Sequence, residues 1–352
     1  MSRYFLDHIG RMAGYVPGEQ PRAGGFIKLN TNENPYPPSP RVAEAVKLAL
    51  GDHLRLYPDP VGTRFRQAAA ALHGVEPANI LAGNGSDDLL TILTRAFVGA
   101  GDALAYPAPS YILYRTLAEI QGARPIEVPF EADWTLDPDR FAREAAGARL
   151  ALIANPNSPS GTALSAEALG SIAGRLDCPL IVDEAYATFA EGDAISLVAE
   201  HPNVIVSRTL SKGYSLAGLR LGYLIARPEI VEGLIKVKDS YNCDTLSLVG
   251  GTAALEDVEH TLANRAKILR TRAHLVEAMR GFGFEVPDSR ANFAWCTNGP
   301  PAAKTYEALK ERKILVRLMR YHGHPDGIRI TVGTDDEIDR LLEALREILP
   351  RV

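Results

Sequence analysis

The stretch SRTLSKGYSLAGLRLGY, residues 207–223, lies between two apolar runs that are typical of buried strands. Its lysine, Lys212, is flanked by Thr209 and Ser211, and Arg220 follows eight residues later. A lysine amine just past a strand end can bond to a carbonyl cofactor, while hydroxyls and a guanidinium hold that cofactor's phosphate. The whole stretch is small and polar, so it predicts a packed site; the alternative is an ordinary surface loop with a solvated lysine.

Strand-like apolar runs alternate with helical patterns over residues 80–207. Such alternation predicts an α/β fold with a mostly parallel sheet that helices cover on both faces. In open sheets of this kind the ligand binds beyond the carboxyl ends of the strands. The chemically distinctive groups fall at such ends, so they predict one shared site. These groups are Gly85, Ser86, the loop after Tyr106, residues 155–161, Asp183 and Lys212.

A glycine turn at residues 83–86 connects the strand-like run 79–82 to the helical pattern 89–98. Free backbone N–H groups at the start of such a helix can bind an anion. The turn matches neither the Walker phosphate loop nor the dinucleotide fingerprint. Because capped glycine turns are common, this one predicts a phosphate site only in combination with Lys212.

The composition is that of an ordinary globular protein. The chain has 352 residues, of which 46% are hydrophobic and 23% charged, with a net charge of −5. No basic run favours nucleic acid, no apolar run is long enough for a membrane span, and the N-terminus has no secretion-signal pattern. The three cysteines (Cys178, Cys243 and Cys296) lack metal-binding spacing, so we expect no metal site and a reducing, cytoplasmic location.

From about residue 226 the pattern changes. A long helical pattern covers residues 249–280, and helical patterns at 302–312 and 335–349 alternate with short strand-like runs. These runs are 281–286, 291–296, 314–316 and 328–332. The pattern predicts a second, smaller α/β domain. We therefore expect an N-terminal arm (1–30), a large domain (31–250) and a small C-terminal domain (251–352).

With these pieces in place, the chain resembles the fold-type I aminotransferases that depend on pyridoxal 5′-phosphate (PLP). Within them it resembles the histidinol-phosphate aminotransferases. The motifs that carry the resemblance span nearly the whole chain in family order, and they are specific as a set although each alone is weak. They are LNTNENPYPPSP (29–40), LYPDP (56–60), AGNGSDDLL (82–90), YPAPSYILY (106–114), NPNSPSG (155–161), VDEAYATF (182–189), RTLSKGYSLAGLRLGY (208–223), ANF (291–293) and GIRITVGT (327–334).

The resemblance implies a large PLP-binding domain with a seven-stranded sheet, and it assigns the cofactor contacts. Lys212 would bind PLP covalently and carry the proton at the substrate. Asp183 would keep the pyridine nitrogen protonated, with a helix-capping aspartate as the lesser alternative. Tyr186 would bond the 3′-oxygen and Tyr111 would stack on the ring, unless Tyr111 is a core tyrosine. The phosphate would be bound by Gly85, Ser86, Thr209, Ser211 and Arg220.

The resemblance also implies residues that contact the substrate and the partner subunit. Tyr57 would reach the cofactor phosphate of the other subunit, which makes the protein a homodimer with shared active sites. Arg329, between two isoleucines, is the best candidate for binding a substrate carboxylate or phosphate. Arg317, Tyr15 and Asn32 would be further substrate contacts, with an ordinary surface charge as the alternative for Arg317.

One departure from the family pattern concerns the residue before Pro159. The family usually has an asparagine there, whose side chain contacts the 3′-oxygen of the cofactor, whereas this chain has Ser158. Either Asn157 takes over that contact or Ser158 makes a weaker one.

The activity that the resemblance implies is transamination between L-histidinol phosphate and 2-oxoglutarate, which gives imidazole acetol phosphate and glutamate in histidine biosynthesis. Ping-pong kinetics should follow. The alternatives are an aromatic amino acid aminotransferase of the same subgroup and, with less support, a PLP-dependent decarboxylase of a phosphorylated amino acid. A ligand-sensing module of a transcription regulator would need a DNA-binding domain, and the roughly 25 residues before the first motif are too few for one.

Overall fold

The structure is a computed structural model that describes residues 3–14, 18–20 and 24–351. Its largest element is a seven-stranded sheet with the strand order β2-β8-β7-β6-β5-β3-β4. All neighbouring strands are parallel except at β8, which is antiparallel to both β2 and β7. The predicted mostly parallel seven-stranded sheet is confirmed. The strands are β2 (Ile80–Gly83), β3 (Ala103–Ala108), β4 (Arg124–Pro129), β5 (Leu150–Ala154), β6 (Leu180–Asp183), β7 (Val204–Thr209) and β8 (Gly222–Ile225).

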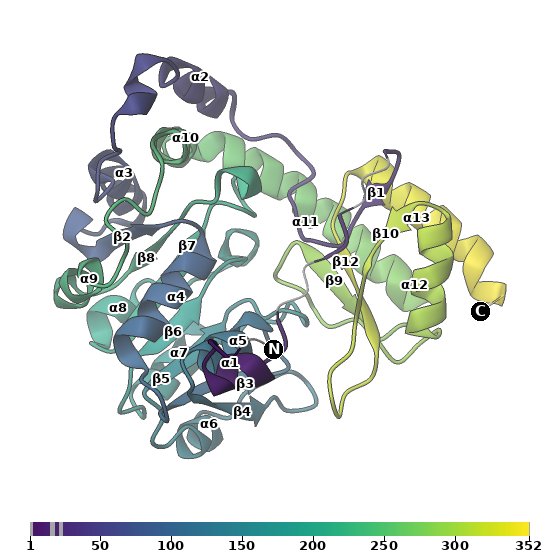
Figure 1. Ribbon diagram of the computed structural model, residues 1–352. Coiled ribbons are helices and arrows are strands. Elements are labelled where there is room, and N and C mark those ends of the chain that lie inside the picture. Colours follow the sequence, from purple (N-terminus) through teal and green to yellow (C-terminus); the bar gives the residue numbers. More distant parts are fainter. Residues whose placement is uncertain (1–2, 15–17, 21–23, 352) are drawn as a thin grey trace.

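Helices cover both faces of this sheet (Figure 1). Successive strand residues point to opposite sides, so an unbroken apolar strand has apolar side chains to bury on each face. Leu152 belongs to one core cluster, while its neighbour Ile153 belongs to the other. The first cluster contains residues of α4 (Ser86–Phe97), α5 (Leu113–Ile120) and α9 (Pro228–Ile235). The second contains residues of α2 (Pro40–Leu48), α3 (Thr63–His73), α6 (Pro138–Glu144), α7 (Ala166–Ala173), α8 (Leu197–Glu200) and α10 (Thr245–Leu255). The continuous apolar strands are thus buried on both sides, as parallel sheets require.

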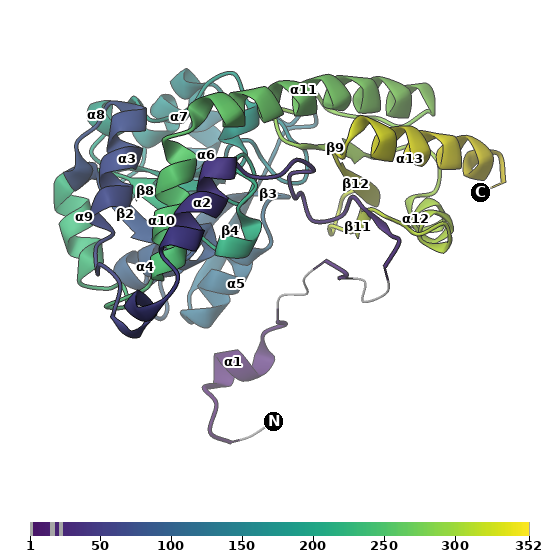
Figure 2. The same ribbon diagram turned by 90° about the horizontal axis from the view of Figure 1, so that it is seen from above.

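A smaller α/β unit with its own hydrophobic core follows in the chain, and Figure 2 shows the long α11 running from the large sheet to this unit. Its three-stranded antiparallel sheet has the order β11-β12-β9. The short β1 near the N-terminus pairs in parallel with β10. The elements are β1 (Ile27–Lys28), α11 (Val258–Gly281), β9 (Phe293–Cys296), α12 (Ala302–Glu311), β10 (Ile314–Leu315), β11 (Arg317–Met319), β12 (Gly327–Thr331) and α13 (Asp335–Ile348).

Two details of the C-terminal part differ from the sequence-based expectation. The helical stretch 249–280 belongs to two helices, because Asp257 leaves the helical conformation (φ −113°, ψ 63°) between α10 and α11. The run 281–286 is not a strand: α11 continues to Gly281, Gly283 turns the chain with φ 87°, and only Glu285 forms an isolated bridge. The predicted boundary at residues 250/251 falls inside α10 and stays a prediction.

The N-terminal residues 24–34 lie against the C-terminal unit. Ile27 and Leu29 are part of its core, and the backbone N–H of Thr331 donates to the carbonyl of Leu29 at 2.9 Å. A short helix, α1 (Asp7–Arg11), precedes them and contacts α5. Within the described residues, no helix has the length and apolarity needed to cross a membrane.

A buried ion pair connects the chain just after β6 to β7: it joins Glu184, which follows β6, to Arg208 in β7. The guanidinium of Arg208 lies 2.7 Å from the carboxylate of Glu184, whose side chain is 0% exposed, and 2.9 Å from Asp193. The carboxylate of Glu184 also accepts a hydrogen bond from the backbone N–H of Ala194. A charge buried this fully depends on its partner, since desolvation is costly.

Replacing Arg208 with methionine should therefore lower the free energy of unfolding by about 3–5 kcal/mol, because it leaves the Glu184 carboxylate buried without a cation. Urea unfolding followed by circular dichroism would measure the loss. The double variant Arg208→Met/Glu184→Gln removes both charges and should recover at least half of it. A loss below about 1 kcal/mol for the single variant, the range of a surface ion pair, would contradict this view of the pair.

Candidate active site

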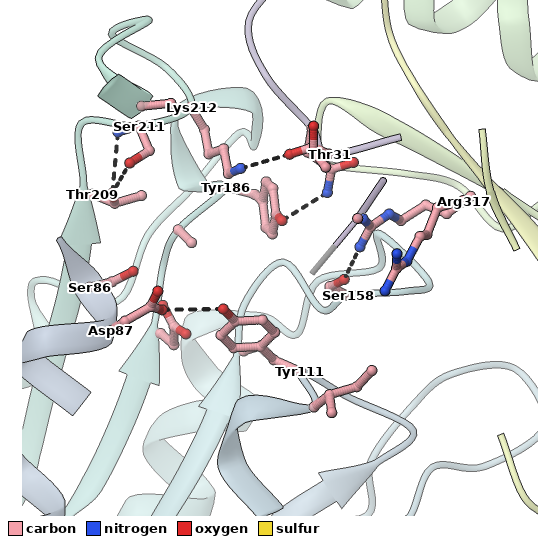
Figure 3. Close-up of a pocket in the computed structure, with 18 of the residues that line it drawn as sticks. Thr31, Ser86, Asp87, Tyr111, Ser158, Tyr186, Thr209, Ser211, Lys212 and Arg317 are labelled. Atoms are coloured by element: carbon pink, nitrogen blue, oxygen red, sulfur yellow. Dashed lines mark hydrogen bonds between the residues drawn. The ribbon is translucent and has the colours of Figure 1, made fainter. Parts of the chain in front are cut away.

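A cavity of about 250 Å³ lies between the large sheet and the β11–β12 hairpin. Ala154, Asp183 and Thr209, the last residues of three adjacent parallel strands, all line it. The cavity therefore lies at the carboxyl edge of the sheet, where the alternating pattern predicts a ligand. Figure 3 shows how side chains from distant parts of the chain converge there. The predicted residues among its lining are Asn32, Ser86, Tyr111, Asp183, Tyr186, Thr209, Ser211, Lys212, Arg220, Arg317 and Arg329.

Among the described residues, Lys212 is the one lysine that lines this cavity. It donates a hydrogen bond to the backbone carbonyl of Thr31 at 3.1 Å. Burial and then the nearby Arg329 guanidinium lower the pKa of this amine to about 8, because both disfavour the charged form. A measurable fraction of the amine is therefore neutral at neutral pH, as a nucleophile or base requires.

Asp183 ends β6 with one carboxylate oxygen satisfied and the other not. The hydroxyl of Tyr114 donates to its Oδ2 at 2.9 Å. Its Oδ1 is buried and has no hydrogen-bond partner among the described residues. Burial raises the pKa of this carboxyl to about 6. Since a buried carboxylate oxygen needs a donor, the unmatched Oδ1 suits an N–H group of a ligand.

An anion cradle lies at the other end of the cavity. Ser86 begins α4, whose first N–H groups point out of the helix. The guanidinium of Arg220 donates to the hydroxyl of Ser211 at 3.3 Å, and Thr209 donates to the same hydroxyl at 3.1 Å. Gly85 lies against the Arg220 guanidinium, and its φ of 83° is a backbone conformation that favours glycine. Hydroxyls, a helix N-terminus and a guanidinium together suit a phosphate.

Two arginines line the side of the cavity that the smaller unit forms. Arg317 on β11 is paired in register with Arg329 on β12, so their side chains leave the same face of the sheet. The Arg329 guanidinium donates to the hydroxyl of Ser158 at 2.9 Å and to the carbonyl of Asn30 at 3.3 Å. Its Nε is buried and has no hydrogen-bond partner among the described residues. This wall suits an anionic substrate group.

Asn32 and two of the predicted tyrosines, Tyr111 and Tyr186, also line the cavity. The hydroxyl of Tyr186 accepts a hydrogen bond from the side-chain amide of Asn32 at 2.9 Å, and its ring packs edge-on against Phe293. The hydroxyl of Tyr111 donates to Asp87 at 3.2 Å. Asp87 also lies 3.5 Å from the Arg220 guanidinium, so it ties the tyrosine to the anion cradle.

Of the predicted site residues that the structure describes, three are not among those that line the cavity: Gly85, which lies against the Arg220 guanidinium, Asn157 and Tyr57. Asn157 is buried in its own loop, where its amide bonds to Ser110, Ser160 and the carbonyl of Pro109, while the lining includes Ser158. Tyr57 is 80% exposed and stacks on Tyr241 outside the cavity. Tyr15 lies outside the described residues.

Sequence reasoning missed two groups that act on the central residues. Tyr114 holds the Asp183 carboxylate, and the Thr31 carbonyl accepts from Lys212. The helical spacing between Tyr111 and Tyr114 could have indicated that both lie on one side of that segment. No sequence signal points to a backbone carbonyl that lies far away in the chain.

Comparisons with known proteins agree with this geometry. The model of the family "Aminotransferase class I and II" matches residues 25–345. The chain is 48% identical to histidinol-phosphate aminotransferase of Rhodopirellula baltica over 97% of both chains. It is 46% identical to histidinol-phosphate aminotransferase 1 of Nostoc sp. over 99% of both. The crystal structure of histidinol-phosphate aminotransferase from Sinorhizobium meliloti in complex with pyridoxal-5′-phosphate matches with a TM-score of 0.92 and 28% identity, over 99% of this chain and 98% of that one.

The resemblance inferred from the nine motifs is thus confirmed at the level of the family and of the fold. A family model that spans most of the chain, together with relatives of 46–48% identity, leaves a single conclusion. The chain belongs to the class I and II aminotransferases and, within them, to the histidinol-phosphate aminotransferases.

Proposed function

We propose that this protein uses PLP to transfer an amino group between L-histidinol phosphate and 2-oxoglutarate, as a step of histidine biosynthesis. The observation that carries the proposal is the convergence in one cavity of a buried amine, an unmatched buried carboxylate oxygen, an anion cradle and two arginines. The names of the full-length relatives support the choice of substrate.

The residues present fit PLP. The unmatched Oδ1 of Asp183 would accept a hydrogen bond from the protonated pyridine nitrogen, and that positive charge would hold this carboxyl ionised despite its burial. The cradle of Ser86, Thr209, Ser211 and Arg220, with the backbone at Gly85, would hold the phosphate. When bound, PLP supplies an electron sink that stabilises negative charge at the substrate carbon next to the amine.

The side chains divide the remaining work. Lys212 would bind the cofactor and would then move a proton at the substrate carbon, for which its lowered pKa is suited. Tyr186, whose hydroxyl Asn32 orients, would donate to the 3′-oxygen of the cofactor, and the ring of Tyr111 would cover the cofactor. Ser158 lines the cavity, whereas Asn157 does not. The side chain that would lie near the 3′-oxygen is therefore that of Ser158, whose hydroxyl also accepts a hydrogen bond from Arg329.

Both substrates are anions, which explains the two arginines. Histidinol phosphate presents a phosphate ester, and glutamate presents two carboxylates. Planar guanidinium groups bind either anion through paired hydrogen bonds. Arg329 and Arg317, in register beside each other, would together hold the phosphate of histidinol phosphate, and each would hold one carboxylate of glutamate. One pocket can thus serve both half-reactions.

A homodimer with shared sites is part of the proposal. Large apolar side chains are exposed close to Tyr57 in the chain, with Leu48 85% exposed and Leu56 53% exposed. An apolar stretch of this kind suits a protein interface. The side chain of Tyr57 would extend from its own subunit to the cofactor phosphate of the partner subunit.

The cellular location that we propose is the cytoplasm. The three free cysteines fit a reducing compartment of this kind.

The lowered pKa of Lys212 predicts how the rate of PLP uptake depends on pH. Only the neutral amine attacks a carbonyl, so the rate of PLP uptake by the cofactor-free protein should rise with pH up to the pKa of about 8 and then level off. An ordinary lysine, with its value of 10.5, would keep gaining rate well above that pH. Stopped-flow absorbance after PLP addition measures the rate. A rise that continues without levelling to pH 10 would contradict the lowered pKa.

The proposed substrate is tested by comparing amino donors with 2-oxoglutarate as acceptor. We expect the kcat/KM for histidinol phosphate to exceed that for phenylalanine by at least about tenfold, because only the phosphate can pair with both arginines. A preference for phenylalanine would instead indicate an aromatic aminotransferase. Release of carbon dioxide from a phosphorylated amino acid would indicate a decarboxylase.

A further inference from the structure

The side chain of Asn34 holds the main chain at the central lysine. Its Nδ2 donates to the carbonyl of Lys212 at 3.0 Å and to that of Gly213 at 3.2 Å. Its Oδ1 accepts from the backbone N–H of Tyr36 at 3.0 Å, which fixes the orientation of the amide. One side chain thus connects a loop near the N-terminus to the two residues that carry the amine.

The residue after the lysine, Gly213, packs tightly against a neighbouring segment. A Cβ on Gly213 would lie 2.4 Å from the hydroxyl of Thr188, so the close approach of the two segments requires glycine. Glycine gives the backbone more conformational freedom than any other residue. A lysine that precedes glycine at a strand end therefore gains order from an outside contact.

The same segment also holds the amine of this lysine. The carbonyl of Thr31 accepts from the Lys212 Nζ at 3.1 Å (Figure 3). The Thr31 hydroxyl in turn accepts from Lys28 at 2.7 Å and donates to Glu33 at 2.6 Å. Residues 30–34, which we call the 30–34 segment, thus bind Lys212 at both its backbone and its side chain.

The 30–34 segment is anchored to the strand that carries Arg329. The backbone N–H of Asn32 donates to the Thr331 hydroxyl at 3.0 Å, and that hydroxyl donates to the side chain of Asn32 at 3.1 Å. Arg329 itself donates to the carbonyl of Asn30 at 3.3 Å. The segment therefore lies between the anion-binding strand and the lysine, in contact with both.

We infer that Asn34 is a positioning residue for Lys212, and that the 30–34 segment fixes the distance between this lysine and the substrate anion held by Arg329. The inference rests on the proposed function, since it takes Lys212 as the group that moves the proton. Asn34 acts through the lysine backbone and is not among the described residues that line the cavity. Its loss should thus affect proton movement and leave substrate binding by the arginines unchanged.

The test uses two variants of Asn34 in the PLP-loaded enzyme. Asn34→Ala removes all three hydrogen bonds, whereas Asn34→Asp keeps the acceptor for Tyr36 and loses both donations to the lysine segment. Misplacement of a reacting group by a fraction of an ångström is costly, so we expect both variants to lower kcat by about 10- to 100-fold. The KM for histidinol phosphate should stay within about twofold, since the anion contacts are intact.

Asn79→Ala is the matched control. The Asn79 amide donates to the carbonyl of Ala226 at 2.8 Å and accepts from the backbone N–H of Glu76 at 3.2 Å. It makes the same kind of contact at the amino end of β2, away from the cavity. Its loss should lower the melting temperature by a similar amount and leave kcat unchanged. Each kcat is expressed per PLP-loaded molecule, so partial unfolding does not lower it.

The inference is overturned if both Asn34 variants keep a kcat within about twofold of the wild type, which is less than one ordinary hydrogen bond would give. It is equally overturned if Asn79→Ala loses as much kcat as they do. The activity of the wild-type enzyme distinguishes failure of this inference from failure of the proposed function. If the wild type transfers the amino group and the Asn34 variants are as active, only the role of Asn34 is refuted.

Discussion

Replacing Lys212 with alanine should lower the rate of amino transfer by at least about 10⁴-fold, the upper range for the loss of a general acid–base group. The variant loses both the covalent hold on the cofactor and the base in the cavity. In the part of the chain that the structure describes, no second lysine lines the cavity and could replace it. The anion cradle is intact in this variant, so the protein should still bind PLP, although without a covalent bond.

A coupled assay of glutamate formation from histidinol phosphate measures the effect, and an exposed lysine provides the control. Lys236 lies at the end of α9 on the surface, so Lys236→Ala should keep the wild-type rate. Residual activity of a tenth or more in the Lys212 variant would show that another group moves the proton.

Replacing Asp183 with asparagine should lower kcat by about 10²–10³-fold, as does the removal of one preorganised electrostatic contact in other enzymes. The asparagine is nearly the same size and can still accept the Tyr114 hydrogen bond. It cannot carry the negative charge that would keep the pyridine nitrogen protonated, so the cofactor becomes a weaker electron sink. The loss is therefore electrostatic and should appear mainly in kcat.

The measurement is steady-state kinetics together with a titration of PLP binding. Asp139, which is 72% exposed and pairs with Arg175, offers a matched control, and Asp139→Asn should have wild-type kinetics. A wild-type kcat in the Asp183 variant would mean that the buried carboxylate serves only to hold Tyr114 and the end of β6.

Much of the fold follows from local patterns in the sequence. The alternation of apolar runs and amphipathic helices indicates a parallel sheet, and the position of each polar group after a strand places it at one edge. Asp183 is the last residue of one strand, and Lys212 comes shortly after the end of another. The two could be predicted to meet because these strands are neighbours in the sheet. Breaks within a helical pattern are harder to predict, as the non-helical Asp257 between α10 and α11 illustrates.

The contacts that sequence reasoning could not find are those between segments far apart in the chain. Nothing in the residues near Thr31 indicates that its carbonyl accepts from a lysine 181 positions later. The choice between Asn157 and Ser158 depends on the backbone path of an irregular loop, where Asn157 bonds to Ser110 and Ser160. Such loops have no repeating pattern that would fix which side chain faces the cavity.

The central claim, that Lys212 is the residue to which the cofactor binds, can be tested by borohydride reduction of the PLP-loaded protein followed by digestion and mass spectrometry. Reduction makes the attachment permanent, and trypsin does not cleave after a modified lysine. We predict that the pyridoxyl group will be found on peptide 209–220, at Lys212. A label on any other lysine, or a protein that binds PLP and carries no label at all, would contradict the account.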